Sequence, residues 1–211
     1  MLLRSLLSLV IFTCIISSTT YAQKETVGHF AVGFQSGILM PINANKGIAS
    51  EQVGLSNGLS FKYFASEHFA MGLGLRVMNN QFMGQTKANN VSITQVPFTF
   101  DFDWYPTKWA LKPFVGLGAG LHFFTVTPVA GLVNTLKEIS NTYTTPAYLL
   151  TLRAGLKYQL SDRISIHGEG TYFQVAEPGD AFLWKQNDGT VYRQFSQKAT
   201  FTVGLFYHFD E

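Results

Sequence analysis

The sequence predicts an all-β fold, an eight-stranded antiparallel up-and-down transmembrane β-barrel. Three observations predict it. Charged residues make up 13% of the 211 residues, against roughly 25% in soluble domains. Aromatic residues make up 15%, and there are 19 glycines. Residues 200–209 alternate strictly between a bulky apolar face and a smaller mixed face, which is the pattern of a strand between lipid and a polar lumen.

Residues 1–22 have the features of a cleaved signal peptide. Arg4 supplies the positive start, residues 6–16 the apolar core, and Thr20-Tyr21-Ala22 the small-residue cleavage site. The barrel domain is then 23–211. It contains no run of about 20 apolar residues, the length that a spanning helix needs.

The single cysteine, Cys14, lies in the apolar core of this leader. A lipoprotein modified at Cys14 is an alternative, but Phe12 and Thr13 fit its cleavage pattern poorly. Cleavage after residue 22 leaves no thiol, which excludes cysteine catalysis, thiolate metal sites and disulfides from the processed chain.

Each strand is predicted where bulky side chains alternate with small or polar ones. The first four are about 28–39 (bulky face Phe30, Val32, Phe34), 53–65 (Leu59, Phe61, Tyr63), 68–79 (Phe69, Met71, Leu73, Leu75, Val77) and 91–104 (Val96, Phe98, Phe100, Phe102, Trp104). Pro97 lies inside the fourth strand. Because proline cannot donate to a ladder, a bulge or a strand start is expected there.

The last four strands follow the same pattern. They are about 113–125 (Val115, Leu117, Ala119, Leu121, Phe123), 146–160 (Tyr148, Leu150, Leu152, Ala154, Leu156, Tyr158), 163–175 (Ile164, Ile166, Tyr172) and 198–209 (Phe201, Val203, Leu205, Tyr207, Phe209).

The connections alternate between long loops, at 40–52, 80–90, 126–145 and 176–197, and short turns at 66–67, 105–112 and 161–162. Outer-membrane barrels alternate in this way, with short periplasmic turns and longer external loops. Both termini are therefore expected in the periplasm. A soluble lipocalin-like barrel is the rival fold, but its outer face would be rich in Lys and Glu rather than in Gly, Ser and Thr.

The mixed face encloses a set of charged side chains: Lys62, Arg76, Asp101, Asp103, Arg153, Lys157, His167 and Glu169. An eight-stranded barrel has just enough interior for side chains to fill, and buried charges require partners. The main interpretation is a salt-bridged plug. The alternative is a gated path in which Arg153 exchanges partners, such as Glu169 and Asp101, to open a narrow water channel.

Ser165, His167 and Glu169 share one face of a strand and are the residue types of an acyl-transfer site. Some eight-stranded barrels are lipid A deacylases whose serine lies two residues after the histidine on the lipid side. Here Glu169 occupies that position, and the face points inward. A lipid-modifying hydrolase is therefore only a remote alternative. No catalytic, metal or cofactor residue is assigned, since His29, His68, His122 and His208 lack ligand spacing.

Aromatic side chains are predicted to form two belts at the headgroup levels, with Trp104, Tyr105 and Trp109 at a short turn. Residues 129–140 have helical spacing, consistent with a short helix on the rim or a lid. Asn187-Asp188-Gly189 predicts a hairpin that extends strands seven and eight. The loops 126–145 and 176–197 are the candidate contacts for an extracellular partner. The net charge of +2 gives no support for nucleic-acid binding.

Five residues of the last strand, Thr202, Gly204, Leu205, Tyr207 and Phe209, resemble the C-terminal assembly signal of bacterial outer-membrane barrels. The chain resembles small eight-stranded outer-membrane barrels of the OmpA, OmpX and OmpW kind and the outer-membrane barrel family common in Bacteroidetes. The resemblance implies the bilayer, outer-membrane lipids and the barrel-assembly machinery as partners, and no cofactor. It also implies a non-enzymatic structural or surface-interaction role, with a narrow channel or carrier for small hydrophobic or ionic solutes as the alternative.

Overall fold

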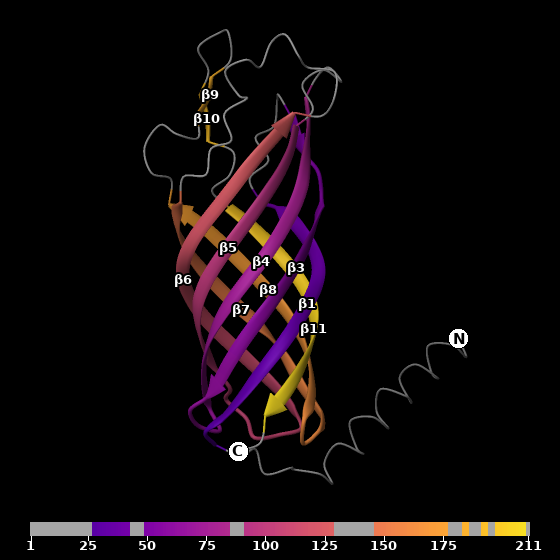
Figure 1. The fold of residues 1–211 in the computed structure, drawn as a ribbon, viewed down its shortest axis with the longest axis vertical. Helices are drawn as coiled ribbons and strands as arrows, with labels where there is room; N and C mark the ends of the chain where they lie inside the picture. Colours follow the sequence, from indigo (N-terminus) through magenta and orange to yellow (C-terminus); the bar gives the residue numbers. More distant parts are fainter. Residues whose placement is uncertain are drawn as a thin grey trace, which may run out of the picture.

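A computed structural model describes residues 27–42, 49–84, 91–128, 146–176, 183–185, 191–193 and 197–209. They form a closed antiparallel barrel in which strands adjacent along the chain pair with each other and the last pairs with the first (Figure 1). The predicted eight-stranded barrel is confirmed. Its strands are β1 (His29–Pro41), β3 (Gly54–Phe64), β4 (Phe69–Gly84), β5 (Val91–Trp104), β6 (Leu111–Pro128), β7 (Ala147–Ser161), β8 (Ile164–Ala176) and β11 (Gln197–Phe209).

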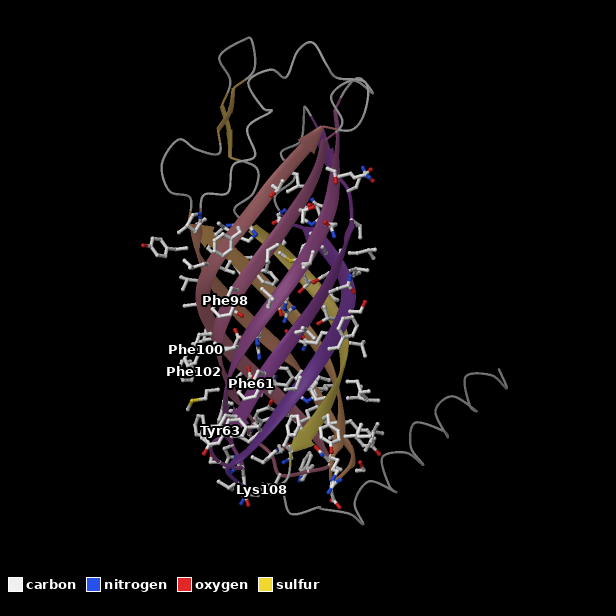
Figure 2. The ribbon with its side chains drawn as sticks, viewed as in Figure 1. Phe61, Tyr63, Phe98, Phe100, Phe102 and Lys108 are labelled. Carbon is white, nitrogen blue, oxygen red and sulfur yellow. The ribbon has the colours of Figure 1, made fainter. Side chains whose placement is uncertain are left out.

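Burial alternates along every strand of the barrel. In β11, Val203 is 63% exposed, whereas its neighbours Thr202 and Gly204 are buried. Phe100 and Phe102 of β5 likewise project from the outer wall (Figure 2). The bulky face of each strand is thus outside and the polar or small face inside, which inverts the arrangement of a water-soluble barrel.

The short connections 65–68, 105–110 and 162–163 lie at one end of the barrel, here called the turn end. β1 begins and β11 ends there, since Phe30 pairs with Phe209. Within the first turn, the Ser66 hydroxyl accepts hydrogen bonds from the backbone N–H groups of His68 (3.2 Å) and Phe69 (3.1 Å). The Lys108 ammonium binds Glu67 between two turns and lowers the pKa of that exposed carboxyl. The opposite end is called the loop end.

Several strands run further toward the loop end than the side-chain pattern predicts, and the largest extensions are in β4 and β6. β4 continues to Gly84 rather than residue 79, and β6 to Pro128 rather than 125. The predicted ends are too short because alternation of apolar side chains marks only the part of a strand that contacts lipid. The backbone hydrogen bonds between strands continue beyond that part. Polar pairs such as Asn79 Oδ1 with Thr94 Oγ1 (2.8 Å) extend the wall, and a short strand, β2 (Ala49–Glu51), pairs with the end of β4.

Pro97 lies in mid-strand without the expected bulge or strand start. Its side chain points inward, and it pairs with His122 of β6. Toward β4 the ladder stops after Leu75–Phe98 and resumes at Met78–Gln95 in the same register. The missing proline N–H is therefore accommodated by a local interruption of the β4–β5 ladder.

Between β8 and β11, the strands β9 (Leu183–Lys185) and β10 (Val191–Arg193) pair as an antiparallel hairpin. The predicted hairpin is present, but it forms a sheet of its own instead of extending the barrel wall. The predicted leader and the helix expected at 129–140 lie outside the described residues. Among the residues described, no helix is long and apolar enough to cross a membrane.

Candidate functional site

Arg153 stands at the centre of the lumen and binds three carboxylates. Its Nη1 donates to Asp101 Oδ2 at 2.6 Å, and its Nη2 donates to Asp103 Oδ1 and Oδ2 at 2.5 and 2.6 Å. The same Nη2 lies 3.8 Å from Glu169 Oε2. All four side chains are at most 5% exposed. At such burial a charge is tolerated only when it is paired and hydrogen-bonded.

Two further cations extend this cluster across the lumen. Lys62 Nζ donates to Asp103 Oδ2 at 2.8 Å. Arg76 binds Glu169 and donates from Nη1 to Thr200 Oγ1 at 3.2 Å. We call Lys62, Arg76, Asp101, Asp103, Arg153 and Glu169 the lumen network. Its three cations and three carboxylates balance in formal charge.

Hydroxyl groups and glycines complete the environment of the lumen network. Thr171 Oγ1 donates to Glu169 Oε1 at 2.7 Å, and Thr99 Oγ1 donates to Asp101 Oδ2 at 3.0 Å. Gly116 and Gly118 of β6 pair with Asp103 and Asp101 of β5. A Cβ atom at either glycine would overlap a carboxylate oxygen of the residue with which it pairs. The glycine face of β6 therefore leaves the room that the charged side chains fill.

The other two predicted lumen residues lie nearer the turn end and outside the lumen network. Lys157 Nζ lies 4.2 Å from the centroid of the Phe64 ring, which is a cation–π distance. His167 stacks on Phe206 with centroids 4.0 Å apart and is fully buried. The structure therefore places all eight predicted side chains inside the barrel, and six of them form the lumen network.

An aromatic layer fills the lumen at the turn end. Its buried residues are Ala31, Phe64, Ala70, Tyr105, Phe114 and Phe206. The Tyr105 ring lies 5.9 Å from Phe64 and 5.5 Å from Phe114, centroid to centroid. Lys62 Nζ lies 5.1 Å from the Phe114 centroid, so the layer adjoins the lumen network. Tyr105, predicted for the outer aromatic belt, is instead 1% exposed inside, because the alternation of β5 continues past Trp104 and turns the next side chain inward.

Three histidines and a serine form a hydrogen-bonded chain beside this layer. His29 Nε2 lies 2.9 Å from His208 Nδ1, and the Ser165 hydroxyl lies 2.8 Å from His208 Nε2 and 3.1 Å from His167 Nε2. Glu169 faces Arg76 and Arg153 instead of His167. Among the described residues, His167 Nδ1 has no hydrogen-bond partner, so a serine, histidine and carboxylate triad is not assembled.

The lumen at the loop end is lined by a second apolar cluster. Leu39, Met78, Ala147, Leu149, Phe173 and Val175 are each at most 5% exposed. Gln95 Nε2 donates to Asn80 Oδ1 at 3.0 Å on the same inner face. The lumen therefore has three layers, apolar, ionic and aromatic, between the loop end and the turn end. Within the described part of the chain, no three His, Cys, Asp or Glu residues are grouped to hold a metal.

Sequence reasoning missed the aromatic layer and the histidine pair. The signal for Phe114 and Phe206 was available, because they share the inward face with Gly116 and Gly204. His29 and His208 also have inward positions, but no spacing rule relates residues at opposite ends of the chain. His29 and His208 come together only because β1 pairs with β11 when the barrel closes. The five residues of the predicted assembly signal divide by face, with Thr202 and Gly204 buried and Leu205, Tyr207 and Phe209 exposed.

Comparison with known proteins gives structural likeness only. No family model and no curated protein sequence matches the chain. Its fold is similar to the outer membrane protein OprG from Pseudomonas aeruginosa, with TM-score 0.61 and 16% identity over 89% of this chain and 98% of that one. The fold is also similar to that of Neisserial surface protein A, with TM-score 0.54 and 14% identity over 85% of this chain and 97% of that one.

The Ail protein of Yersinia pestis gives a TM-score of 0.51 and 11% identity over 87% of this chain and 100% of that one. The likeness to all three spans nearly the whole of each solved structure. Together with closure, strand order and the outward apolar face, it establishes that this chain has the fold of the small eight-stranded outer-membrane β-barrels.

Proposed function

We propose that the protein is an integral barrel of the bacterial outer membrane with a structural or surface-interaction role and a lumen closed by its own side chains. Exposed apolar side chains cover the wall, as in Leu117 at 61% and Leu152 at 54%. Water would make such a surface unstable, whereas hydrocarbon accommodates it. The bilayer and its lipids are then the main partners.

The lumen network is the observation that carries the closed-lumen proposal. Its ion pairs and hydrogen bonds join residues from β3, β4, β5, β7, β8 and β11, six of the eight strands around the wall. Side chains therefore bridge the lumen from wall to wall, and the aromatic layer lies beneath them. Opening a path would break these buried ion pairs, and a buried charge left without its partner is strongly destabilising.

The orientation follows from the lengths of the connections. Short turns at one end and longer loops at the other match the periplasmic and external sides of outer-membrane barrels, so both termini belong in the periplasm. In the same way, Thr202, Gly204, Leu205, Tyr207 and Phe209 form the strand that the barrel-assembly machinery would recognise.

A surface role would lie at the loop end. The β9–β10 hairpin stands in the 176–197 segment, apart from the barrel sheet (Figure 1). The structurally similar Yersinia pestis protein is named an attachment invasion locus protein. Contact with an external partner through 126–145 and 176–197 is therefore part of the proposal.

A carrier for small hydrophobic solutes is the second candidate, and two observations favour it. An apolar cluster lies in the lumen at the loop end, beside the polar Asn80 and Gln95, and the β4–β5 ladder is interrupted beside Pro97. A solute stopped by the lumen network would have to leave through the wall. Paired residues flank the interruption on both sides, which favours the closed barrel over the carrier.

Conductance in planar bilayers tests the closed lumen. The wild-type protein is expected to give no resolved current steps in concentrated potassium chloride, because the lumen network blocks the path. Arg153→Ala or Glu169→Ala should open a measurable conductance, since each removes a link across the lumen. Lys108→Ala, at an exposed ion pair, serves as the matched control, and heat-modifiable gel migration checks that each variant is folded. Steady wild-type steps would contradict the closed lumen.

A further inference from the structure

A hydrogen-bonded polar pair interrupts the lipid-facing surface of β1 and β3. Ser36 Oγ donates to Asn57 Oδ1 at 2.8 Å. The two residues are directly opposite each other in the β1–β3 ladder, and both lie in the outward rows of their strands. The pair faces away from the lumen and plays no part in the lumen network.

Exposed apolar side chains surround this pair on every side. They are Phe34 and Leu59 toward the turn end, Ile38 and Leu55 toward the loop end, and Val203 and Val77 on the neighbouring strands. Other outward polar pairs are placed differently. Asn79 with Thr94, for example, is followed toward the loop end by the polar Gln81 and Ser92. Ser36 and Asn57 therefore lie within the apolar band and not at its rim.

The amide of Asn57 has more hydrogen-bonding capacity than Ser36 uses. Its oxygen accepts one bond from Ser36, and among the described residues no acceptor is bonded to its NH₂ group. Phospholipid acyl chains offer neither donors nor acceptors, so an amide left facing them loses its hydrogen bonds to water without replacement. The position calls for a polar partner that enters the membrane with the protein.

We propose that the Ser36–Asn57 pair is the centre of a contact between two copies of this chain within the membrane. A carboxamide is both donor and acceptor, so it is complementary to itself across a two-fold axis. Such an axis brings Asn57 NH₂ of each copy to Asn57 Oδ1 or Ser36 Oγ of the other. The small side chain of Ser36 leaves room beside the Asn57 amide for the amide of the second copy.

Energy transfer between labelled copies tests the contact. Full-length Cys14→Ser protein, expressed with its leader and purified folded, carries one label at Asp162→Cys in an exposed turn. Transfer in phosphatidylcholine vesicles is measured against the protein-to-lipid ratio. Asn57→Leu is expected to weaken association about tenfold. Polar contacts between helices in a membrane change the association constant by about this amount, and we expect the same of a polar contact between two barrels.

The matched control is Asn79→Leu, the same substitution at the loop-end polar pair, which should leave association unchanged. Asn57→Leu adds an apolar side chain to an apolar surface, so it is expected to fold, and heat-modifiable migration verifies this. Random-mixing transfer in the wild type, or equal loss in both variants, would overturn the proposal. The proposal would also be overturned if the protein were monomeric and retained a hydroxyacyl lipid only when Asn57 is present. The Ser36–Asn57 pair would then be a lipid-binding site.

Discussion

Replacing Arg153 with methionine is expected to destabilise the folded barrel by about 3–5 kcal/mol, the range for breaking a buried ion pair from one side. The substitution keeps a long side chain but leaves Asp101, Asp103 and Glu169 without their shared cation. Lys62 and Arg76 each retain one carboxylate, so they compensate only in part. The loss is measured by urea unfolding of the protein in phospholipid vesicles.

The control for Arg153→Met is Lys108→Met, which removes the exposed ion pair with Glu67. Solvent screens exposed pairs, so they contribute little to stability, and this variant should unfold close to the wild type. Adding Asp101→Asn to Arg153→Met should restore part of the stability, because the Lys62–Asp103 and Arg76–Glu169 pairs then remain and no excess carboxylate is left. Equal effects of Arg153→Met and Lys108→Met would show that the lumen network contributes nothing specific.

Placing arginine at Leu152 is expected to destabilise the barrel by about 2–4 kcal/mol, the cost of a cation near the bilayer midplane. Leu152 is exposed and pairs with Leu117 and Tyr172, so apolar side chains lie on both sides of it. Tyr148→Arg lies on the same face of the same strand, close to the loop end, where the cost should fall to about 0–1 kcal/mol. Both variants are measured by the same unfolding assay.

The depth dependence is the informative part of this comparison. If water bathed the outer wall, arginine would be accepted at both positions, and neither variant would lose stability. Equal large losses at Leu152 and Tyr148 would instead indicate general damage to β7.

Side-chain alternation was enough to predict the barrel and the face that each strand turns inward. β5 was predicted to its final residues, Val91–Trp104. Alternation could not locate the loop ends of β4 and β6, because strands above the bilayer no longer need an apolar face. Nor could it predict how the ladder accommodates Pro97. That depends on whether the position without an N–H faces β4 or β6, and the ladder to β4 is the one interrupted.

The sequence was enough to predict which charged side chains face the lumen, but not which of them form ion pairs with each other. Parity alone places Lys62, Arg153 and Glu169 inside. Which charges meet depends on the stagger of the strands, and ion pairs such as Arg76–Glu169 join strands that are not neighbours in the wall. Tyr105 was misplaced because it was grouped with its neighbour Trp104, although alternation continues past Trp104 and turns Tyr105 inward.

In the proposed membrane arrangement, the bulky face of every strand meets hydrocarbon and the polar face is enclosed. Tryptophan quenching by lipids brominated on their acyl chains tests it most directly. One protein carries Phe100→Trp as its sole tryptophan, and another keeps only Trp109, which is 72% exposed at the turn end. Quenching by the brominated lipid is expected to be strong at position 100 and weaker at Trp109, which aqueous acrylamide reaches instead. Quenching of position 100 by acrylamide but not by brominated lipid would contradict this arrangement.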